Sequence, residues 1–233
     1  MADTGYSRSP KIAKGAFVQL LTDIVGIIPN IVVFQYNPES ISRTLTPWNP
    51  FAVDQAQRGS QAPTVQPFDV AETFGSFRIE LDATDDLEDG DPIAVVTGIE
   101  TRLAALRKLT QASEGLVGDL IASAKSLVGA GEDEARRPTV APTLLVLGPR
   151  LILPVRVTSF QVEENAHLPS YFPIRAVVTM SLEVLTPDSF RCQQDIAGKI
   201  AVAAYEFTRL QEDANALLNV ANNVDAIRAM LPF

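Results

Sequence analysis

The stretches LILPVRVTSFQVEEN, residues 151–165, and PIRAVVTMSLEVLT, residues 173–186, decide the fold class of this chain. In both, apolar side chains alternate with polar ones, which is the pattern of a β-strand with one buried face. The connection at 164–173 joins these strands, and the turn GPR joins the first of them to an earlier apolar run at 144–147. Strands that meet in hairpins predict an antiparallel sheet, which must bury its apolar side against other elements.

A polar corner lies between two further strands near the N-terminus. Residues 31–36, IVVFQY, are rich in β-branched and aromatic side chains and indicate a strand buried on both faces, preceded by turn residues at 26–30. The corner NPES, residues 37–40, is turn chemistry, because proline fixes φ and the Asn and Ser side chains bond the local backbone. Residues 41–46 then alternate in character, which predicts a half-buried strand.

The remaining elements of the first half are two strands and two helices. Residues 16–21 predict a short strand, and FGSFRIELDA, residues 74–83, a longer one that alternates cleanly. From residue 93 to residue 109 the apolar spacing changes to three and four, which predicts a helix, and residues 116–128 predict a second. The expected inward positions are Phe77, Ile79, Leu81, Ile99, Leu103, Leu106 and Leu109.

The order of elements divides the chain into three parts. Residues 1–14 are expected to form a flexible polar arm, residues 15–187 a β-rich domain, and residues 188–233 a helical extension. Within the domain, the proline- and glutamine-rich residues 47–73 predict an extended loop, and residues 112–143 a helical and linker insertion. The predicted fold class is α+β: an antiparallel sheet, rolled into a barrel or two layers, with a flanking helix and a long C-terminal helix.

The composition favours a packed protein that binds neither nucleic acid nor membranes. The 233 residues are 46% apolar and 20% charged, which is enough for a core. The net charge is −9 and Lys and Arg do not cluster, which argues against phosphate-rich partners. No apolar run approaches the roughly 20 residues that span a bilayer, and the first residues do not resemble a signal peptide. Cys192 is the only cysteine, so no intrachain disulfide is expected, as suits synthesis in a reducing cytoplasm.

Side chains that carry out chemistry are scarce. His167 is the only histidine, so a hydrolase would depend on it, yet neither a G-x-S-x-G motif nor the cysteine lies near it. The acidic run at 82–91 fails the calcium-loop pattern, because a loop that starts at Asp85 places Leu87 and Val96 at ligand positions. We expect this run to cap the following helix instead. The sequence therefore predicts no enzyme activity, no metal site and no cofactor.

The C-terminal segment carries a heptad pattern. Its apolar positions recur at intervals of four and three, as in a helix that packs along a seam, and about four heptads span roughly 40 Å. The seam consists of Ile196, Ile200, Ala203, Phe207, Leu210, Ala214, Leu217, Ala221 and Val224. Two interpretations stay open: the seam packs on the chain's own sheet, or it docks across a subunit boundary or onto another protein.

Several motifs resemble one family in the same order along the chain. FQYNPESISRTL, residues 34–45, resembles a phrase at the start of the tube-type N-terminal domain in baseplate and adaptor proteins of phage-tail-like contractile injection systems. FGSFRIELDATD, residues 74–85, is similar to a family strand, with Leu81 where phenylalanine is frequent, and TRLAALRKL, residues 101–109, to the family helix. Residues 144–186 match best, through the phrases PVRVTS and PIRA.

This resemblance implies a tail-tube-like barrel or two-layer sheet that works by assembly. Such domains build rings, usually sixfold, around a channel, so a homo-hexamer is implied, with inner tube, spike, sheath, baseplate wedge or cap proteins as partners. The corner at Asn37 and Pro38 would position strands for pairing with a neighbour, and loop 47–73 would reach an adjacent subunit. Larger relatives carry a LysM module where this chain has residues 188–233, so peptidoglycan binding is not implied. The particle would assemble in the bacterial cytoplasm and stay there or leave by lysis.

We therefore expect a non-enzymatic, ring-forming adaptor that joins the inner tube to the baseplate or spike. Two alternatives stay open: a cap-side adaptor that terminates the tube, and a monomeric β-barrel that binds an apolar ligand. The residues expected to contact partners are Asn37, Pro38, Trp48, Phe51, Phe68, Ile196, Ile200, Phe207, Leu210, Leu217 and Val224.

Overall fold

The computed structural model describes most of the predicted β domain and C-terminal helix. The predicted arm except Lys14, most of loop 47–73 and part of the 112–143 insertion lie outside the described residues. Phe51, Phe68 and Val224 also lie outside them. The described residues are 14–23, 26–48, 69–112, 116–127, 140–191 and 195–223.

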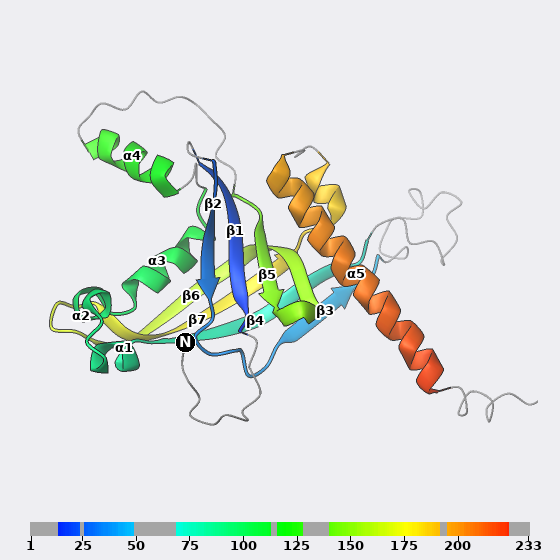
Figure 1. Ribbon diagram of the computed structural model, residues 1–233, viewed down its shortest axis with the longest axis horizontal. Coiled ribbons are helices and arrows are strands. Elements are labelled where there is room, and N and C mark those ends of the chain that lie inside the picture. The colour runs from blue at the N-terminus through cyan, green and yellow to red at the C-terminus, as the bar shows by residue number, and fades with distance from the viewer. Residues whose placement is uncertain are drawn as a thin grey trace, which may run out of the picture.

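Strands and helices alternate along the chain in blocks (Figure 1). In chain order the elements are β1 (Ala16–Asp23), β2 (Gly26–Val33), β3 (Ser42–Thr46), β4 (Ala71–Asp82), α1 (Thr84–Glu88), α2 (Pro92–Thr97), α3 (Glu100–Lys108), α4 (Leu116–Leu127), β5 (Thr143–Leu147), η2 (Gly148–Arg150), β6 (Leu151–His167), β7 (Pro173–Val184), η3 (Pro187–Phe190) and α5 (Ile196–Asn222).

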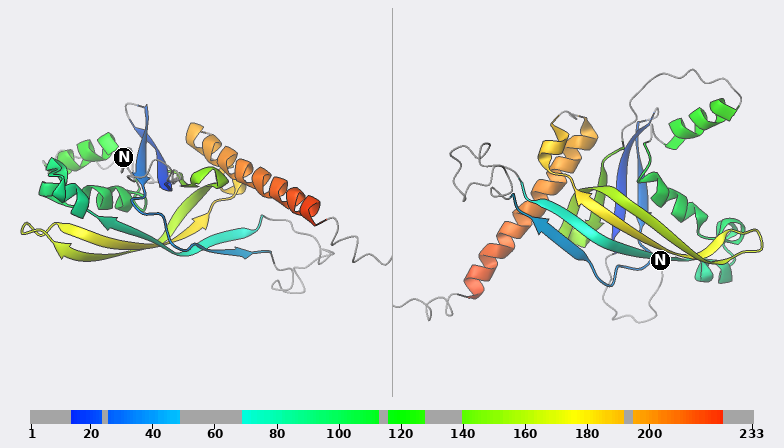
Figure 2. Two further views of the ribbon diagram at one scale, coloured as in Figure 1. Left: turned by 60° about the horizontal axis from the view of Figure 1, so that its bottom comes forward. Right: turned by 180° about the vertical axis from the view of Figure 1, so that it is seen from behind.

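Within the described residues, seven strands form one antiparallel sheet in the order β2-β1-β5-β6-β7-β4-β3. The predicted hairpins β5–β6 and β6–β7 are confirmed, and the fold is α+β as expected. Figure 2 shows two layers: β3, β4 and the long parts of β6 and β7 lie lengthwise, while β1, β2 and β5 stand across them beside the helices. The long C-terminal helix α5 lies at the end of the molecule opposite to α1 and α2 (Figures 1 and 2).

Strand β6 connects the two layers. Its first residues pair with β5, and from Val155 onward it pairs with β7. An irregularity between Val157 and Ser159 lies near the point where the pairing partner changes. Such bulges bend a strand and increase its twist, so a single strand of 17 residues can serve both layers.

Aromatic packing brings the segment that follows edge strand β2 against β4, which is the neighbour of the other edge strand, β3. The ring of Phe34, just after edge strand β2, lies 5.2 Å from the ring of Phe17 and 5.7 Å from that of Phe77 on β4. The next residue, Gln35, accepts a hydrogen bond of 2.9 Å from the backbone N–H of Asp82. The short segment after β2 therefore crosses from one edge strand to the neighbourhood of the other, which curls the sheet around a core.

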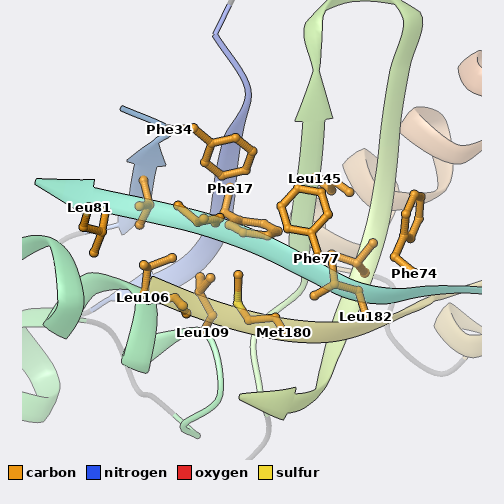
Figure 3. Packing of buried hydrophobic residues seen from close by; sticks show 14 of the residues in the cluster. Phe17, Phe34, Phe74, Phe77, Leu81, Leu106, Leu109, Leu145, Met180 and Leu182 are labelled. Carbon is orange, nitrogen blue, oxygen red and sulfur yellow. The ribbon is translucent and has the colours of Figure 1, made fainter. Parts of the chain in front are cut away.

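Helix α3 fills the interior between the layers. The predicted inward residues Ile99, Leu103, Leu106 and Leu109 are all buried, and so are Phe77, Ile79 and Leu81 of β4. Figure 3 shows the aromatic rings together with Leu106, Leu109 and Met180 in one packed cluster. The helix predicted at 93–109 is divided at Gly98, whose φ of +55° ends α2 before α3 begins. The expectation that the acidic run caps a helix is confirmed, since Asp91 accepts hydrogen bonds from the N–H groups of Ile93 and Ala94.

Four predictions about residues 26–73 are wrong. Residues 26–30 lie in β2 and do not form a turn, and this strand is not buried on both faces, because Ile31 and Val33 are 54% and 55% exposed on an edge of the sheet. Strand β3 is not half-buried: Leu45 is 48% exposed, and of its residues only Arg43 is partly covered. The loop predicted at 47–73 ends earlier, because residues 71–73 belong to β4 and pair with β3.

Candidate assembly surface

Helix α5 packs on its own domain through small side chains. The buried positions Ala197, Ala201, Tyr205 and Thr208 recur at intervals of four, four and three, so they form one face of the helix. Ala197 and Ala201 pack with Leu20, Leu144 and Phe190, which are side chains of β1, β5 and η3. Alanine lets the helix axis approach the strands closely, and the Asp195 side chain caps the helix by accepting from the N–H of Gly198 at 2.9 Å.

The middle of α5 hydrogen-bonds to the start of β6. The hydroxyl of Thr208 donates to the carbonyl of Ile152 at 2.7 Å and accepts from its N–H at 3.1 Å. Ile152 pairs with β5 on one side, and the β6–β7 ladder reaches only to Val155, so Thr208 satisfies backbone groups that have no strand partner there. The helix therefore covers a local sheet edge and is fixed to it.

A cluster of two arginines and two glutamates joins α5 to the β3–β4 hairpin. Glu72 of β4, whose side chain is 0% exposed, accepts from Nε and Nη2 of Arg43 on β3. Arg43 also donates to Glu212 at 2.8 Å, and Arg209 donates to Glu212 at 2.7 Å. The guanidinium of Arg209 lies 5.0 Å from the centre of the Tyr205 ring. Bidentate contacts of this kind fix orientation as well as distance.

The charges of the cluster stabilise one another. The hydrogen bond to Glu72 is the largest effect that raises the pKa of Arg43 above its ordinary value. Burial of Glu212 opposes its ionisation, but hydrogen bonds from Arg43 and Arg209 outweigh that effect and hold its pKa below the ordinary value. Both effects favour the charged forms of Arg43 and Glu212, and the ion pairs of these residues fix α5 to the β3–β4 hairpin.

The predicted heptad seam lies on the opposite side of α5 from these contacts. The exposed fractions of its large residues are 63% for Ile196, 40% for Ile200, 43% for Phe207, 68% for Leu210 and 72% for Leu217. The interpretation that the seam packs on the chain's own sheet is thus wrong for these residues, which were also expected to contact partners. From Asp213 to Asn223 every residue of the helix is exposed, and this part projects beyond the domain (Figures 1 and 2).

The predicted corner residues serve contacts within the chain. The Asn37 side chain accepts a hydrogen bond of 3.0 Å from the N–H of Gly15, which fixes the corner to the start of β1. Pro38 and Trp48 are partly buried. The corner therefore joins β2 and β3, which are the first and last strands in the order of the sheet.

The exposed apolar residues of the edge strands were missed by sequence reasoning. Ile31 and Val33 of β2 and Leu45 of β3 point away from the core on strands that each pair with one neighbour. The alternating pattern of residues 41–46 was visible in the sequence, but that pattern does not show which side of the strand faces outward. For 31–33, a continuous β-branched run concealed the alternation altogether.

The candidate catalytic and metal-binding residues do not form a reactive centre in the part of the chain that the structure describes. His167 is not in a loop: it is the last residue of β6, with its ring stacked 4.9 Å from Tyr171 and Nε2 3.8 Å from an oxygen of Glu164. Among the described residues, no group of three or more His, Cys, Asp or Glu side chains is placed to hold a metal ion. Nor does any described helix have the length and apolar character that a membrane crossing requires.

Comparison with known proteins adds no assignment. No protein-family model matches the chain, and no curated protein matches it significantly.

Proposed function

We propose that this chain is a non-enzymatic structural component of a phage-tail-like contractile injection particle, in which it forms a ring that joins the inner tube to the baseplate or spike. The kind of particle rests on the motif resemblance over residues 34–45, 74–85, 101–109 and 144–186. The assembly function rests on surfaces of the folded chain.

The observation that carries the proposal is the division of α5 into two faces. One face, centred on Ala201, is buried against the chain's own strands. The other presents Phe207, Leu210 and Leu217 to solvent along a projecting helix. A row of large exposed apolar side chains on one face of a helix is the pattern of a site of protein interaction. Because folding uses the other face, the exposed one is available to a partner.

The sheet edges supply a second type of contact. Strands β2 and β3 are the first and last strands of the sheet, and backbone groups at such an edge pair readily with another chain. The two edges differ in sequence and length, so pairing one edge with the other edge of a second copy is a head-to-tail contact. Contacts of this type form a ring when the rotation from copy to copy closes and a filament when it does not.

The packed interior favours assembly over the binding of an apolar ligand. The space between the layers is occupied by the rings of Phe17, Phe34 and Phe77 and by the leucines of α3 (Figure 3). A ligand-binding barrel keeps that space for its ligand.

The test is sedimentation velocity and negative-stain electron microscopy of the full chain, alone and mixed with the tube and spike proteins of the same genome. We expect rings or ring-sized oligomers and co-sedimentation with the tube protein. A His167→Ala variant serves as a control and should assemble normally. A chain that stays monomeric at every concentration and sediments apart from the tube and spike proteins would refute the proposal.

A further inference from the structure

The exposed face of α5 carries a charge pattern beside its apolar seam. Lys199, Glu206 and Asp213 follow at intervals of seven residues, so they lie along one flank. Glu206 and Asp213 are exposed, and each directly precedes a seam residue, Phe207 or Ala214. Among residues 210–223 the acidic side chains are Asp213 and Glu212, and Glu212 is paired with Arg43 and Arg209 on the side that faces the domain. The flank beside the exposed seam therefore carries one lysine, Lys199, and two exposed carboxylates, Glu206 and Asp213.

A hollow in the surface adjoins the seam at Ala203, one of its three alanines. It is lined by Phe190, Arg191, Gly198, Lys199, Val202, Ala203 and Glu206. A small seam residue beside a hollow receives a large side chain from a facing helix, as a hole receives a knob in a coiled coil. The partner residue opposite Ala203 is thus expected to be large and apolar.

A second copy of α5 fits this surface poorly. In a parallel pair, the seam alanines Ala203, Ala214 and Ala221 would face their own copies and leave little apolar contact. The flank of the second copy that would face Glu206 and Asp213 consists of Ala197, Ala204, Gln211 and Leu218, and it carries no positive charge.

We propose that the exposed face of α5 binds an amphipathic helix of a partner protein that carries large apolar residues along its seam and Lys or Arg on its flanks. The complex is a two-helix coiled coil in which the partner's large residues fill the alanine positions and its cations lie beside Glu206 and Asp213. This inference rests on the proposed function, in which α5 is a docking surface, and names the kind of partner.

Two synthetic peptides test the proposal against the full-length chain. Both have four heptads with leucine at the seam positions, and one carries lysine and the other glutamate at every flanking position. Each peptide is kept from pairing with itself by its own like charges. We expect the basic peptide to bind in a fluorescence anisotropy titration, the acidic peptide not to bind, and added salt to weaken binding.

Variants locate the binding surface. Leu210→Asp combined with Leu217→Asp should weaken binding of the basic peptide about tenfold or more, because two apolar contacts are lost. Glu206→Lys combined with Asp213→Lys should reverse the preference between the two peptides. All four side chains are exposed, so circular dichroism should show native folding. Val95→Asp, which changes a 52% exposed residue on α2, is the matched control and should bind as the parent does.

The inference is overturned if the two peptides bind equally, if neither binds, or if the leucine variants retain full binding. It is also overturned if the chain self-associates through α5. That outcome would be an oligomer in sedimentation that the two leucine substitutions abolish and that the basic peptide does not dissociate. Ring formation and co-sedimentation with the tube protein are measured separately. Rings without peptide binding would therefore reject the partner class while leaving the proposed function in place.

Discussion

Replacing Arg43 with methionine removes the main partner of Glu72, a carboxylate with a fully buried side chain. Breaking a buried ion pair from one side typically costs about 3–5 kcal/mol, because the remaining charge is left without compensation. Here the cost is smaller, since the Arg43 side chain is 26% exposed and Nη2 of Arg209 stays 3.6 Å from Glu72. We expect a loss of about 2–3 kcal/mol in the free energy of unfolding, measured by urea denaturation followed by circular dichroism.

Two further variants make this expectation refutable. Arg78→Met breaks an ion pair with Glu80 on β4 whose side chains are 61% and 56% exposed, and should cost less than about 1 kcal/mol. The double variant Arg43→Met, Glu72→Met removes both charges and should recover most of the loss, because similar apolar side chains substitute well for a buried pair. If Arg43→Met is no more destabilising than Arg78→Met, or the double variant is as unstable as the sum of the single ones, the cluster does not hold α5 to the hairpin.

Three other outcomes follow from the described contacts. Gly98→Ala should lower the free energy of unfolding by about 2 kcal/mol or more, because φ is +55° and the new Cβ would lie 2.2 Å from a backbone oxygen. Gly90→Ala, where φ is +71° and the space around the new Cβ is open, should lower it by about 1 kcal/mol. Thermal unfolding compares the two variants. Asp91→Ala removes the cap of α2 and should cost about 1 kcal/mol, with Asp91→Asn retaining most of the stability in the same assay. The folded-state pKa of Glu212 lies below its ordinary value of 4.5, so its contribution to stability is complete above that pH and is lost as the pH falls further. The free energy of unfolding, measured in urea from pH 6 to pH 3, should therefore decline less steeply for Glu212→Gln than for the parent chain. An equal decline in the two proteins would contradict this expectation.

The core strands and helix α3 were predictable because large apolar residues follow a single period there. Phe77, Ile79 and Leu81 alternate, and Leu103, Leu106 and Leu109 recur at helical spacing, so burial follows from pattern alone. The bulge in β4 was not predictable. Phe74 and Phe77 are three residues apart and both buried, because Ser76 adopts a φ of +51° and shifts the register between them.

The start of β2 was misread because its residues are common in turns. Pro29 fits a strand here since β2 is at an edge: the N–H of its partner Leu20 is directed to Pro142, so the proline nitrogen faces the open side and no ladder hydrogen bond is lost. Asn30 is buried because its amide donates to Gln19 and to the carbonyl of Ala105 in α3. Both explanations depend on neighbours from other parts of the chain, which a local pattern does not contain.

The candidate surface was predictable in its residues but not in its orientation. The heptad pattern identified Ile196, Phe207 and Leu210 as one face of a helix, and the structure describes that face as exposed. The face that packs inward consists of alanines, a tyrosine and a threonine, which carry little hydrophobic signal. The face of α5 that turns inward is decided by its close approach to the strands and by the hydrogen bonds of Thr208 to Ile152. Both depend on the folded sheet.

The separation of small and large side chains on α5 has an evolutionary consequence. In the proposed docking role, substitutions at the leucine and phenylalanine positions would change the partner that the helix binds without disturbing the alanines that pack on the domain. Specificity for a partner would then diverge between related chains at nearly constant folding stability. A helix that used one set of side chains for both purposes would lose that independence.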